Sequence, residues 1–577
     1  MGGRKDRAIK RSMGLMKFFD DYDLAAALSR WSRSWRGPTL AALIALVAGL
    51  PGLLAMPPLD RDESRFTQAT TQMLEQNDFV VIRYQDQPRF KKPVGIYWLQ
   101  AASVSLVSSP EARQIWAYRL PSLLGAMIAA AACAWGAAAF FGDRAGLIAG
   151  ALLASGFLLS TEAFIAKTDA VLAGATTLAL ACLARLYAAE HGGPAARRGT
   201  RILFWTAMGL GTLVKGPITP MVAGLTLLAL WAWDRKAGWI ARLGWAWGLI
   251  LFFTIVGPWA WAVTVATDGA FWNAAIVGDL APKLAGGQES HGGPPGYHTL
   301  VAFIQTFPAT LLLPAALALG WRARHEPGVR FALCWLVPAW LVFELTPTKL
   351  SHYALPCYGA LAWLAAAAVT RPMGALAQRL GAGLQALIGV LLAAVVLYLA
   401  KLYGDPGDIP FVFATALLLA AAGLIGGWAM LRGPAVKALA LSLPLGLLGH
   451  AALVGTLAPR LEPLLLSQRT EAMLASAHLL PRQGVYPGPV AVAGYAEPSL
   501  VFAVGTRTQL GDAKEAAEAL AENRPAVIEA RQQAAFDTLV KAARLTPRKI
   551  GEIKGLDYSN GDDMTLTVYA PQPETRP

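Results

Sequence analysis

Asp60, Asp62 and Glu63 place three carboxylates within four consecutive positions, directly after an apolar segment that ends at Pro57 and Pro58. Negative charges this close at a membrane surface repel one another unless a cation, a metal ion or a substrate compensates them. A solvated loop with incidental acids is the simpler of two explanations. The other is a site in which the acids meet a charged ligand, and basic residues elsewhere in the chain bear on that choice.

Lysines stand in four further short segments that lie between apolar stretches. These segments contain Lys92 after Phe90, Lys167 and Asp169 in AKTD, Lys215 in KGP, and Lys349, His352 and Tyr353 in TKLSHY. Lysines at the ends of membrane spans commonly serve only as anchors in the headgroup region. Anchors should follow the charge bias toward the cytoplasmic side, whereas the order of the apolar segments puts these turns on the opposite side. The pattern therefore indicates converging ammonium groups, which suit a phosphate dianion.

The composition indicates that membrane helices must position these residues. Of 577 residues, 55% are hydrophobic and 15% are charged, whereas a soluble globular chain has about 25% charged residues. This excludes a cytosolic enzyme and a disordered chain. The four cysteines all lie in apolar stretches, so no disulfide framework or zinc site is predicted. The net charge of +13 is spread over short loops, which favours membrane topology over a nucleic-acid partner.

Thirteen apolar segments predict thirteen transmembrane helices, because each approaches the length that crosses a hydrocarbon core of about 30 Å. They lie near 38–57, 118–140, 146–161, 171–189, 202–214, 217–233, 243–264, 299–320, 331–346, 353–370, 382–402, 410–431 and 438–458. Every loop that this count returns to the side of the basic N-terminal tail contains arginine or lysine. The positive-inside rule then makes that side cytoplasmic. The expected fold is mainly α, a polytopic membrane protein with a small C-terminal α/β domain.

The chain divides into three predicted regions. Residues 1–37 form a cytoplasmic tail with an interfacial helix, residues 38–458 form the transmembrane domain, and residues 459–577 form a small periplasmic α/β domain. In the last region GPVAVAG and MTLTVYA predict strands, and AKEAAEALAEN predicts a helix.

Two long loops are predicted on the periplasmic side. Residues 58–117 contain the acidic cluster, and their mixture of polar and aromatic residues predicts short interfacial helices. Residues 265–298 are rich in glycine and proline, which is typical of a mobile, substrate-covering loop. Glu289 and His291 in this loop are candidates for contact with a polar substrate, although a histidine beside glycines is more often a turn residue.

Together these motifs resemble those of the bacterial polyprenyl-phosphate-sugar-dependent glycosyltransferases of the C-type fold, in the group of lipid A aminoarabinose transferases and protein mannosyltransferase-like enzymes. The residues that match are Asp62, Glu63 and Arg65; Phe90, Lys92, Pro93, Tyr97 and Trp98; Lys215, Gly216 and Pro217; and Thr348 to Tyr353. The resemblance covers the first ten spans, and the remainder only in general layout. One departure is Lys91, where many relatives have glutamate. Its added positive charge suits an acidic sugar or an anionic acceptor.

The resemblance implies an inverting glycosyltransferase of the bacterial inner membrane whose active site faces the periplasm. It implies a polyprenyl-phosphate sugar as donor, a lipid or glycan acceptor, and membrane lipids as surroundings. The implied catalytic residues are Asp62 and Glu63; donor phosphate would bind Lys92, Lys215, Lys349 and Arg65; and substrate would contact Tyr97, Asp169, Glu289, His291, His352 and Tyr353. In such a site a carboxylate stabilises oxocarbenium character or deprotonates a hydroxyl, while the cations stabilise the leaving phosphate.

Several alternatives stay open at this level. The acceptor is lipid A, another lipopolysaccharide component, or a serine or threonine of a secreted protein. No cofactor is identified and no metal ligand set is predicted, although the carboxylates leave a divalent metal open. A transporter or flippase for a lipid-linked sugar is the alternative of a different class. It predicts titratable residues near the bilayer midplane and broken helices, whereas polar residues here gather at one edge of the spans. The C-terminal region could also bind another envelope protein.

Overall fold

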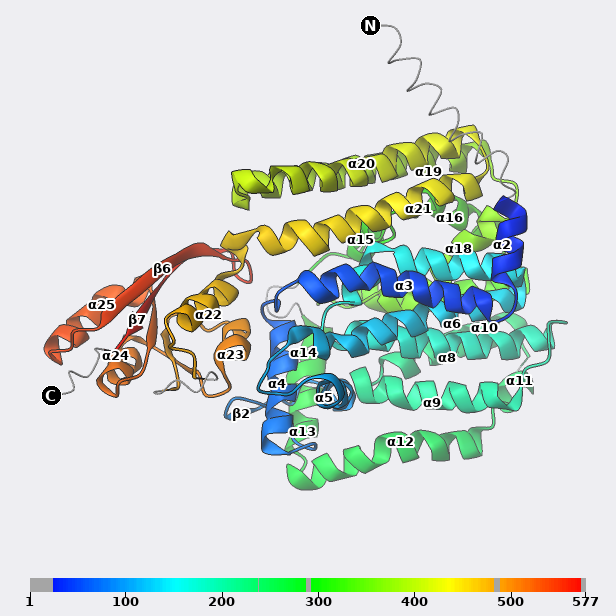
Figure 1. Ribbon diagram of the computed structural model, residues 1–577. Helices are drawn as coiled ribbons and strands as arrows, with labels where there is room; N and C mark the ends of the chain where they lie inside the picture. The colour runs from blue at the N-terminus through cyan, green and yellow to red at the C-terminus, as the bar shows by residue number, and fades with distance from the viewer. Residues whose placement is uncertain (1–23, 237, 287–291, 482–487, 572–577) are drawn as a thin grey trace, which may run out of the picture.

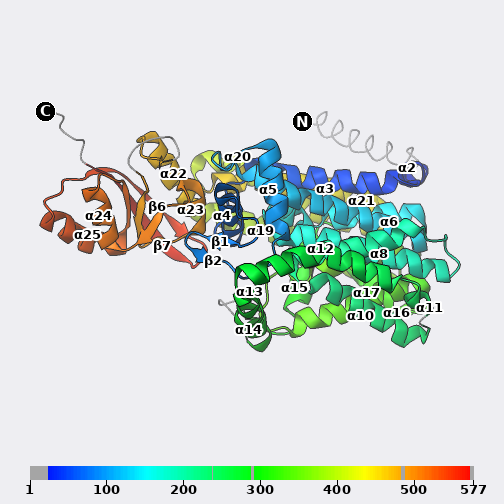
Figure 2. The same cartoon turned by 90° about the horizontal axis from the view of Figure 1, so that it is seen from below.

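The computed structural model describes residues 24–236, 238–286, 292–481 and 488–571. Long helices form a bundle, and a smaller α/β unit lies at one end of it in both views (Figures 1 and 2). A short helix, α2 (Leu24–Ser32), precedes the bundle in the described part of the chain.

Eight helices among the described residues are long and apolar enough to cross a membrane. The long apolar elements are α3 (Arg36–Ala55), α6 (Ile115–Ser155), α8 (Thr168–Glu190), α12 (Trp245–Ala266), α17 (Pro327–Leu345), α19 (Ala375–Tyr403), α20 (Ile409–Arg432) and α21 (Ala435–Ala452). Between them lie α9 (Arg198–Lys215), α10 (Ile218–Asp234) and α18 (Tyr358–Val369). Their outward faces carry large apolar side chains such as Trp261, which is 72% exposed. Such surfaces require lipid around them. The predicted fold class is confirmed, while the count of thirteen spans stays a prediction.

The second and third predicted spans are joined in α6. Gly142 interrupts the helical backbone with a φ of 81° and a ψ of 164°, a conformation that glycine adopts with little strain. The two halves then pack closely, because a Cβ on Gly150 would lie 2.8 Å from the carbonyl oxygen of Ala130. The interruption separates the two predicted spans at the expected place.

The predicted span 299–320 is wrong as a single helix. It consists of α15 (Tyr297–Gln305), the 3-10 turn η2 (Thr310–Leu312) and α16 (Leu313–Arg322). Pro308 lies at the break, and proline cannot donate a helical hydrogen bond. Gln385 compensates, since its side chain donates to the Pro308 carbonyl at 3.0 Å and accepts from the Leu311 N–H at 3.2 Å. Breaks inside a bundle require such replacements.

The first predicted outer loop contains α4 (Asp62–Gln76), the hairpin β1 (Arg83–Tyr84) and β2 (Gln87–Pro88), and α5 (Gly95–Val107). The short helices expected there are present. Hydroxyl groups anchor α4 to the bundle: Thr70 donates to Gln100 at 2.7 Å, and Thr71 bonds with Tyr118 at 2.7 Å. The start of α4 therefore has a fixed place over the ends of the spans.

The second predicted outer loop is largely helical where the structure describes it. It contains α13 (Ala270–Trp272), the π-helix η1 (Asn273–Leu280) and α14 (Ala281–Ala285). Glycines and prolines cluster only after residue 285, so the preceding apolar stretch remains free to form helices. Glu289 and His291 lie outside the described residues, and the expected mobility stays a prediction.

The C-terminal unit is built on a five-stranded mixed sheet of order β4-β3-β5-β7-β6. Its strands are β3 (Ala491–Ala493), β4 (Gln509–Gly511), β5 (Ala526–Glu529), β6 (Arg548–Asp557) and β7 (Asp562–Ala570). Strand β3 is parallel to β4 and β5, whereas β7 is antiparallel to β5 and β6. The helices are α22 (Leu466–Ser476), α23 (Pro498–Val504), α24 (Ala513–Ala521) and α25 (Ala530–Ala542). The predicted strands and helix of this region are confirmed. Helix α23 lies beside α4 (Figures 1 and 2).

Candidate active site

A polar cavity of about 280 Å³ lies where α4, α14 and the ends of α8 and α9 meet. This is the end of the bundle next to the C-terminal unit (Figure 1). The lining side chains are those of Asp60, Arg61, Asp62, Arg65, Phe66, Arg89, Lys91, Lys92, Lys167, Thr168, Asp169, Lys215, Lys283, Thr348, Leu350, His352 and Tyr353. Eight are basic and three are acidic. The excess of positive charge is suited to an anionic ligand.

Asp62 lies at the start of α4 and lines the cavity. It is exposed, unlike its neighbour Glu63. Helix α4 is held by bonds at Thr70 and Thr71, and the Asp62 carboxylate at its start shares the cavity with the basic turns. The arrangement permits contact with the neutral part of a ligand whose anionic part meets the cations.

Glu63 does not line the cavity, in contrast to the prediction that it shares the site with Asp62. It is 1% exposed and forms two 2.8 Å hydrogen bonds with the Arg119 guanidinium. Its carboxylate also accepts the N–H groups of Leu59 at 2.9 Å and Ala166 at 2.7 Å. With both oxygens so engaged, Glu63 joins the acidic turn to the 163–167 turn and has no oxygen directed at a ligand.

Asp169 and Lys215 form an ion pair in the lining of the cavity. The Lys215 Nζ lies 2.5 Å from Asp169 Oδ1, and it lies 5.1 Å from the centre of the Tyr353 ring. Lys167 lies 3.8 Å from Asp169 and 3.0 Å from Glu162. The AKTD, KGP and TKLSHY turns, far apart in sequence, therefore converge as the sequence predicts.

His352 lies between the same groups. Its Nδ1 is 3.3 Å from Lys167 Nζ, and its Nε2 is 3.6 Å from Asp169 Oδ2. Burial, opposed by Asp169 and aided by Lys167 and Lys215, lowers the pKa of His352 to about 3. The imidazole is thus neutral at physiological pH, and it can accept a hydrogen bond from Lys167 while donating toward Asp169.

Lys92 belongs to a second group of charges, on the side of α14. Its Nζ lies 3.1 Å from Asp279, which also pairs with Lys283 at 2.6 Å. Burial and the neighbouring Lys283, opposed by Asp279, together lower the pKa of Lys92 to about 8. Lys92 therefore changes its charge within the range in which enzymes are commonly assayed.

Two further predicted residues lie outside the cavity. Lys349 is 5% exposed, and its ammonium group donates to the carbonyl oxygens of Glu344 and Thr346 at 2.7 and 2.6 Å. Its charge stabilises the end of α17 instead of facing the cavity. Tyr97 is fully buried and packs against Phe66. The cavity does contain Asp62, Arg65, Lys92, Asp169, Lys215, His352 and Tyr353.

Six charged lining residues were not among the residues to which the resemblance assigns a site role. They are Asp60, Arg61, Arg89, Lys91, Lys167 and Lys283. Asp60, Lys91 and Lys167 stand inside segments that the sequence singles out for their charge, although the resemblance assigns them no site role. Lys283 has no such signal, because it reaches the cavity only through the fold of α14. Among the described residues, no three His, Cys, Asp or Glu side chains are arranged to hold a metal ion.

Known families and proteins that are similar to this chain agree with the anionic ligand that the cavity suits. Residues 91–261 match the family described as dolichyl-phosphate-mannose-protein mannosyltransferase. The undecaprenyl phosphate-alpha-4-amino-4-deoxy-L-arabinose arabinosyl transferase of Pseudomonas paraeruginosa is 28% identical over 399 residues, which are 66% of this chain and 70% of that protein. The enzyme of the same name from Aeromonas salmonicida is 27% identical over 66% of this chain and 70% of its own.

A solved structure shares the fold. The crystal structure of ArnT from Cupriavidus metallidurans bound to undecaprenyl phosphate has a TM-score of 0.72 and 21% identity. The match covers 92% of this chain and 97% of that one, so it includes the bundle and the C-terminal unit. The resemblance to polyprenyl-phosphate-sugar-dependent glycosyltransferases, predicted from the motifs, is confirmed by these similarities.

Proposed function

We propose that the chain is a glycosyltransferase of the bacterial inner membrane, which moves a sugar from a polyprenyl-phosphate donor to an envelope acceptor on the periplasmic face. Lipid A or another lipopolysaccharide component is the favoured acceptor. The relatives named above are transferases whose names specify an undecaprenyl-phosphate sugar. The observation that carries the proposal is the cavity that sets the Asp62 carboxylate against a wall of cations.

The charges fit the reaction that such a donor undergoes. The bond between the anomeric carbon and the phosphate oxygen breaks, its electron pair leaves with the polyprenyl phosphate, and the acceptor oxygen bonds to the carbon. Lys92 and Lys215 are positioned to stabilise the phosphate as its negative charge grows. Asp62 takes the proton of a hydroxyl acceptor or stabilises positive character on the sugar. An ionised phosphate acceptor needs no base, and Asp62 then orients the reactants.

An apolar cavity of about 280 Å³ provides a place for the isoprenoid chain. It lies between α5, α6, α8 and α9 and is lined by apolar residues such as Trp98, Leu124 and Leu203. Val214 belongs to this lining, and the next residue, Lys215, belongs to the polar cavity. A lipid phosphate bound at Lys215 could therefore extend its chain along α9.

The proposed orientation rests on the distribution of charge. The helix ends on the side predicted to be cytoplasmic carry arginine. They are Arg198 at the start of α9, Arg235 after α10 and Arg432 at the end of α20. Basic loops of this kind stay in the cytoplasm, which leaves the cavity and the C-terminal unit in the periplasm. We further propose the division into a tail at 1–37, a catalytic membrane domain at 38–458 and a periplasmic domain at 459–577.

Transfer by the purified protein in lipid nanodiscs tests the function. Undecaprenyl-phosphate aminoarabinose is supplied with lipid A, or with a serine-containing peptide, and products are identified by mass spectrometry. We expect a lipid A product, with kcat about 10²-fold lower in Asp62→Asn and Lys215→Ala. Asp537→Asn, which alters an exposed residue of α25, is the matched control. Transfer to the peptide alone would replace lipid A by protein as the proposed acceptor. Full activity in both site variants would refute the assignment of Asp62 and Lys215 to the active site.

A further inference from the structure

The C-terminal unit contacts the acidic turn that precedes α4. The Asp60 N–H donates to the Tyr558 hydroxyl at 2.8 Å, and the Ser499 hydroxyl donates to the Asp60 carboxylate. Ser499 is itself bonded to Ser467 at 2.6 Å, and Ser467 to Tyr495 at 3.0 Å. A chain of buried hydroxyl groups thus connects the core of the C-terminal unit to a residue that lines the cavity, two positions before Asp62.

The backbone of the acidic turn requires such support. Arg61, between Asp60 and Asp62, has a φ of 57° and a ψ of −103°. A residue with a Cβ rarely adopts this conformation, and it persists only where the surroundings impose it. Two bonds come from α4 itself, where Glu63 accepts the Leu59 N–H and Ser64 donates to the Leu59 carbonyl at 2.5 Å. Those at Asp60 come from the C-terminal unit.

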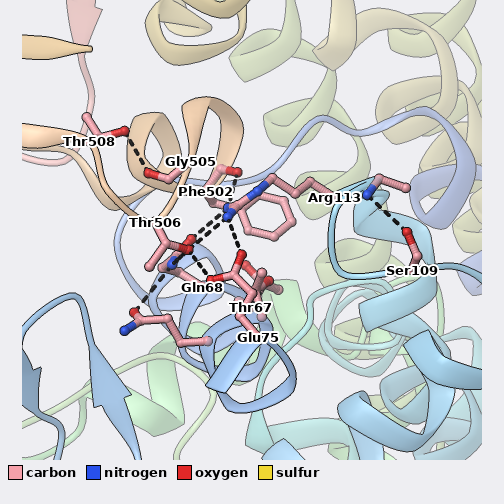
Figure 3. A network of polar contacts seen from close by, with 12 residues as sticks. Thr67, Gln68, Glu75, Ser109, Arg113, Phe502, Gly505, Thr506 and Thr508 are labelled. Carbon is pink, nitrogen blue, oxygen red and sulfur yellow. Dashed lines mark hydrogen bonds and ion pairs between the residues drawn. The ribbon is translucent and has the colours of Figure 1, made fainter. Parts of the chain in front are cut away.

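A second junction fixes the middle of α4 to the same unit (Figure 3). Arg113, which is 9% exposed, donates to Gln68 on α4 and to the Phe502 carbonyl of α23, both at 2.8 Å. It also pairs with Glu75 at 3.0 Å and donates to Thr506 at 2.8 Å. Gln68 and Glu75 both bond with the Thr506 hydroxyl. Helix α4 is thereby held against α23 over more than one turn.

The junctions coincide with the element that carries the proposed catalytic carboxylate. We propose that the C-terminal unit is a positioning element of the active site, in which Ser499 and Tyr558 act through Asp60 to fix the direction of Asp62. This inference rests on the proposed function, and it assigns the unit a task that does not require it to bind another protein. Asp60 lines the cavity, whereas Ser499 and Tyr558 are outside its lining and act only through Asp60.

The proposal separates turnover from donor binding. Lys92 and Lys215, which are placed to hold the donor phosphate, pair with Asp279 and Asp169 on other elements. Arg65, the other predicted phosphate ligand in the cavity, lies within α4, which has its own bonds at Thr70 and Thr71. Loosening Asp60 should therefore misplace Asp62 while leaving the phosphate contacts intact. A misplacement of about 1 Å can lower a rate about 10²-fold. A general loss of folding would instead change donor KM, kcat and the amount of folded protein together.

The variants remove single hydroxyl groups. Ser499→Ala combined with Tyr558→Phe should lower kcat about 10- to 100-fold with donor KM within about twofold of the wild type. Tyr569→Phe, in the same unit but bonded to Gln533, is the matched control. Asp60→Asn retains an oxygen that can accept from Ser499, so it should keep more of the kcat than Asp60→Ala. Wild-type kcat in the double variant would overturn the proposal.

A second measurement does not depend on activity. Amide hydrogen exchange of the intact protein should be faster at residues 59–64 in the double variant than in Tyr569→Phe, with residues 345–353 unchanged. Unchanged exchange at 59–64 would overturn the positioning role even if no donor were accepted. Failure of the wild type to transfer any sugar, with faster exchange in the variant, would reject the proposed function and retain the junction as the support of the turn.

Discussion

The pH dependence of donor use should depend on Lys92. Because the pKa of Lys92 is lowered to about 8, the free enzyme loses this positive charge as the pH rises from 7 to 9. At a pKa of about 8, the charged fraction falls from about nine-tenths at pH 7 to about one-tenth at pH 9. The ratio kcat/KM reports the ionisation of the free enzyme, so it should fall above pH 8 toward a tenfold loss per unit.

The fall of kcat/KM above pH 8 is the alkaline limb of the pH profile. The structure predicts how each of three substitutions changes this limb. Lys92→Arg keeps the charge at all assay pH values, so the limb should flatten. Asp279→Asn removes the carboxylate that raises the pKa of Lys92, so the limb should move to lower pH. Lys283→Met removes the repelling cation, so it should move to higher pH. Each displacement should be about one pH unit, since one pKa unit corresponds to about 1.4 kcal/mol and such neighbours act at this scale.

Initial rates over a series of donor concentrations, from pH 6 to 10 in a constant-ionic-strength buffer, measure the limb. Salt must be held constant because it screens the charges at the cavity mouth. The control is Lys401→Arg, on the exposed end of α19, whose limb should match the wild type. If Lys92→Arg retains the wild-type limb, or if the Asp279 and Lys283 variants shift it in the same direction, another group carries the titration and the reasoning about Lys92 fails.

Three further outcomes follow from the structure. Arg119→Met leaves Glu63 buried without its partner, so the variant should lose about 3 to 5 kcal/mol of stability and melt well below the wild type, whereas Arg119→Met with Glu63→Leu should recover part of the loss. Burial, with Glu497 and Asp557 adding to it, raises the pKa of Asp60 from 3.8 to about 7. The folded protein therefore holds a proton that the unfolded chain loses in this window, so stability should fall as the pH rises from about 4 to 7; Asp60→Asn should weaken this slope in thermal melts. Ala175→Trp narrows the apolar cavity, so KM should rise for an undecaprenyl donor and not for a donor with a short prenyl chain; equal changes in both would place the chain elsewhere.

The fold follows from the sequence wherever a single physical rule determines it. Lipid requires long apolar helices, so the spans around α3, α8 and α12 are evident from hydropathy alone. Strand β7 of the C-terminal unit follows from alternation of apolar and polar residues, and β3 follows from a short apolar run. The prediction of a single helix over 299–320 failed because the sequence does not show that Gln385, on another helix, bonds the Pro308 carbonyl and the Leu311 N–H, which the break leaves open. Helices tolerate proline where a neighbour satisfies the freed backbone group.

The site residues divide in the same way. Lys92, Lys215 and His352 stand in turns that the sequence places on the same side of the membrane. They were therefore expected near one another, and the cavity contains all three. Position along the chain does not reveal which way a side chain points, and this is why Glu63 and Lys349 were expected in the cavity. Adjacent residues of a helix diverge by about 100°, so one of Asp62 and Glu63 must turn inward. The buried partner, Arg119, is in a span that shows no site motif.

Two lysines of the cavity are already paired before a ligand arrives. Lys215 with Asp169 and Lys92 with Asp279 are ion pairs in a poorly solvated place, and an unpaired charge there would be expensive. A phosphate that enters must therefore share these lysines with the carboxylates and not meet bare charge, which limits ground-state affinity. As the sugar–phosphate bond breaks, the leaving phosphate gains negative charge and competes better for the same lysines. The pairs thus favour the transition state over the bound donor, which is the requirement for raising kcat. Asp169→Asn should accordingly tighten donor binding while lowering kcat, and weaker binding of the donor to that variant would contradict this role of the pair.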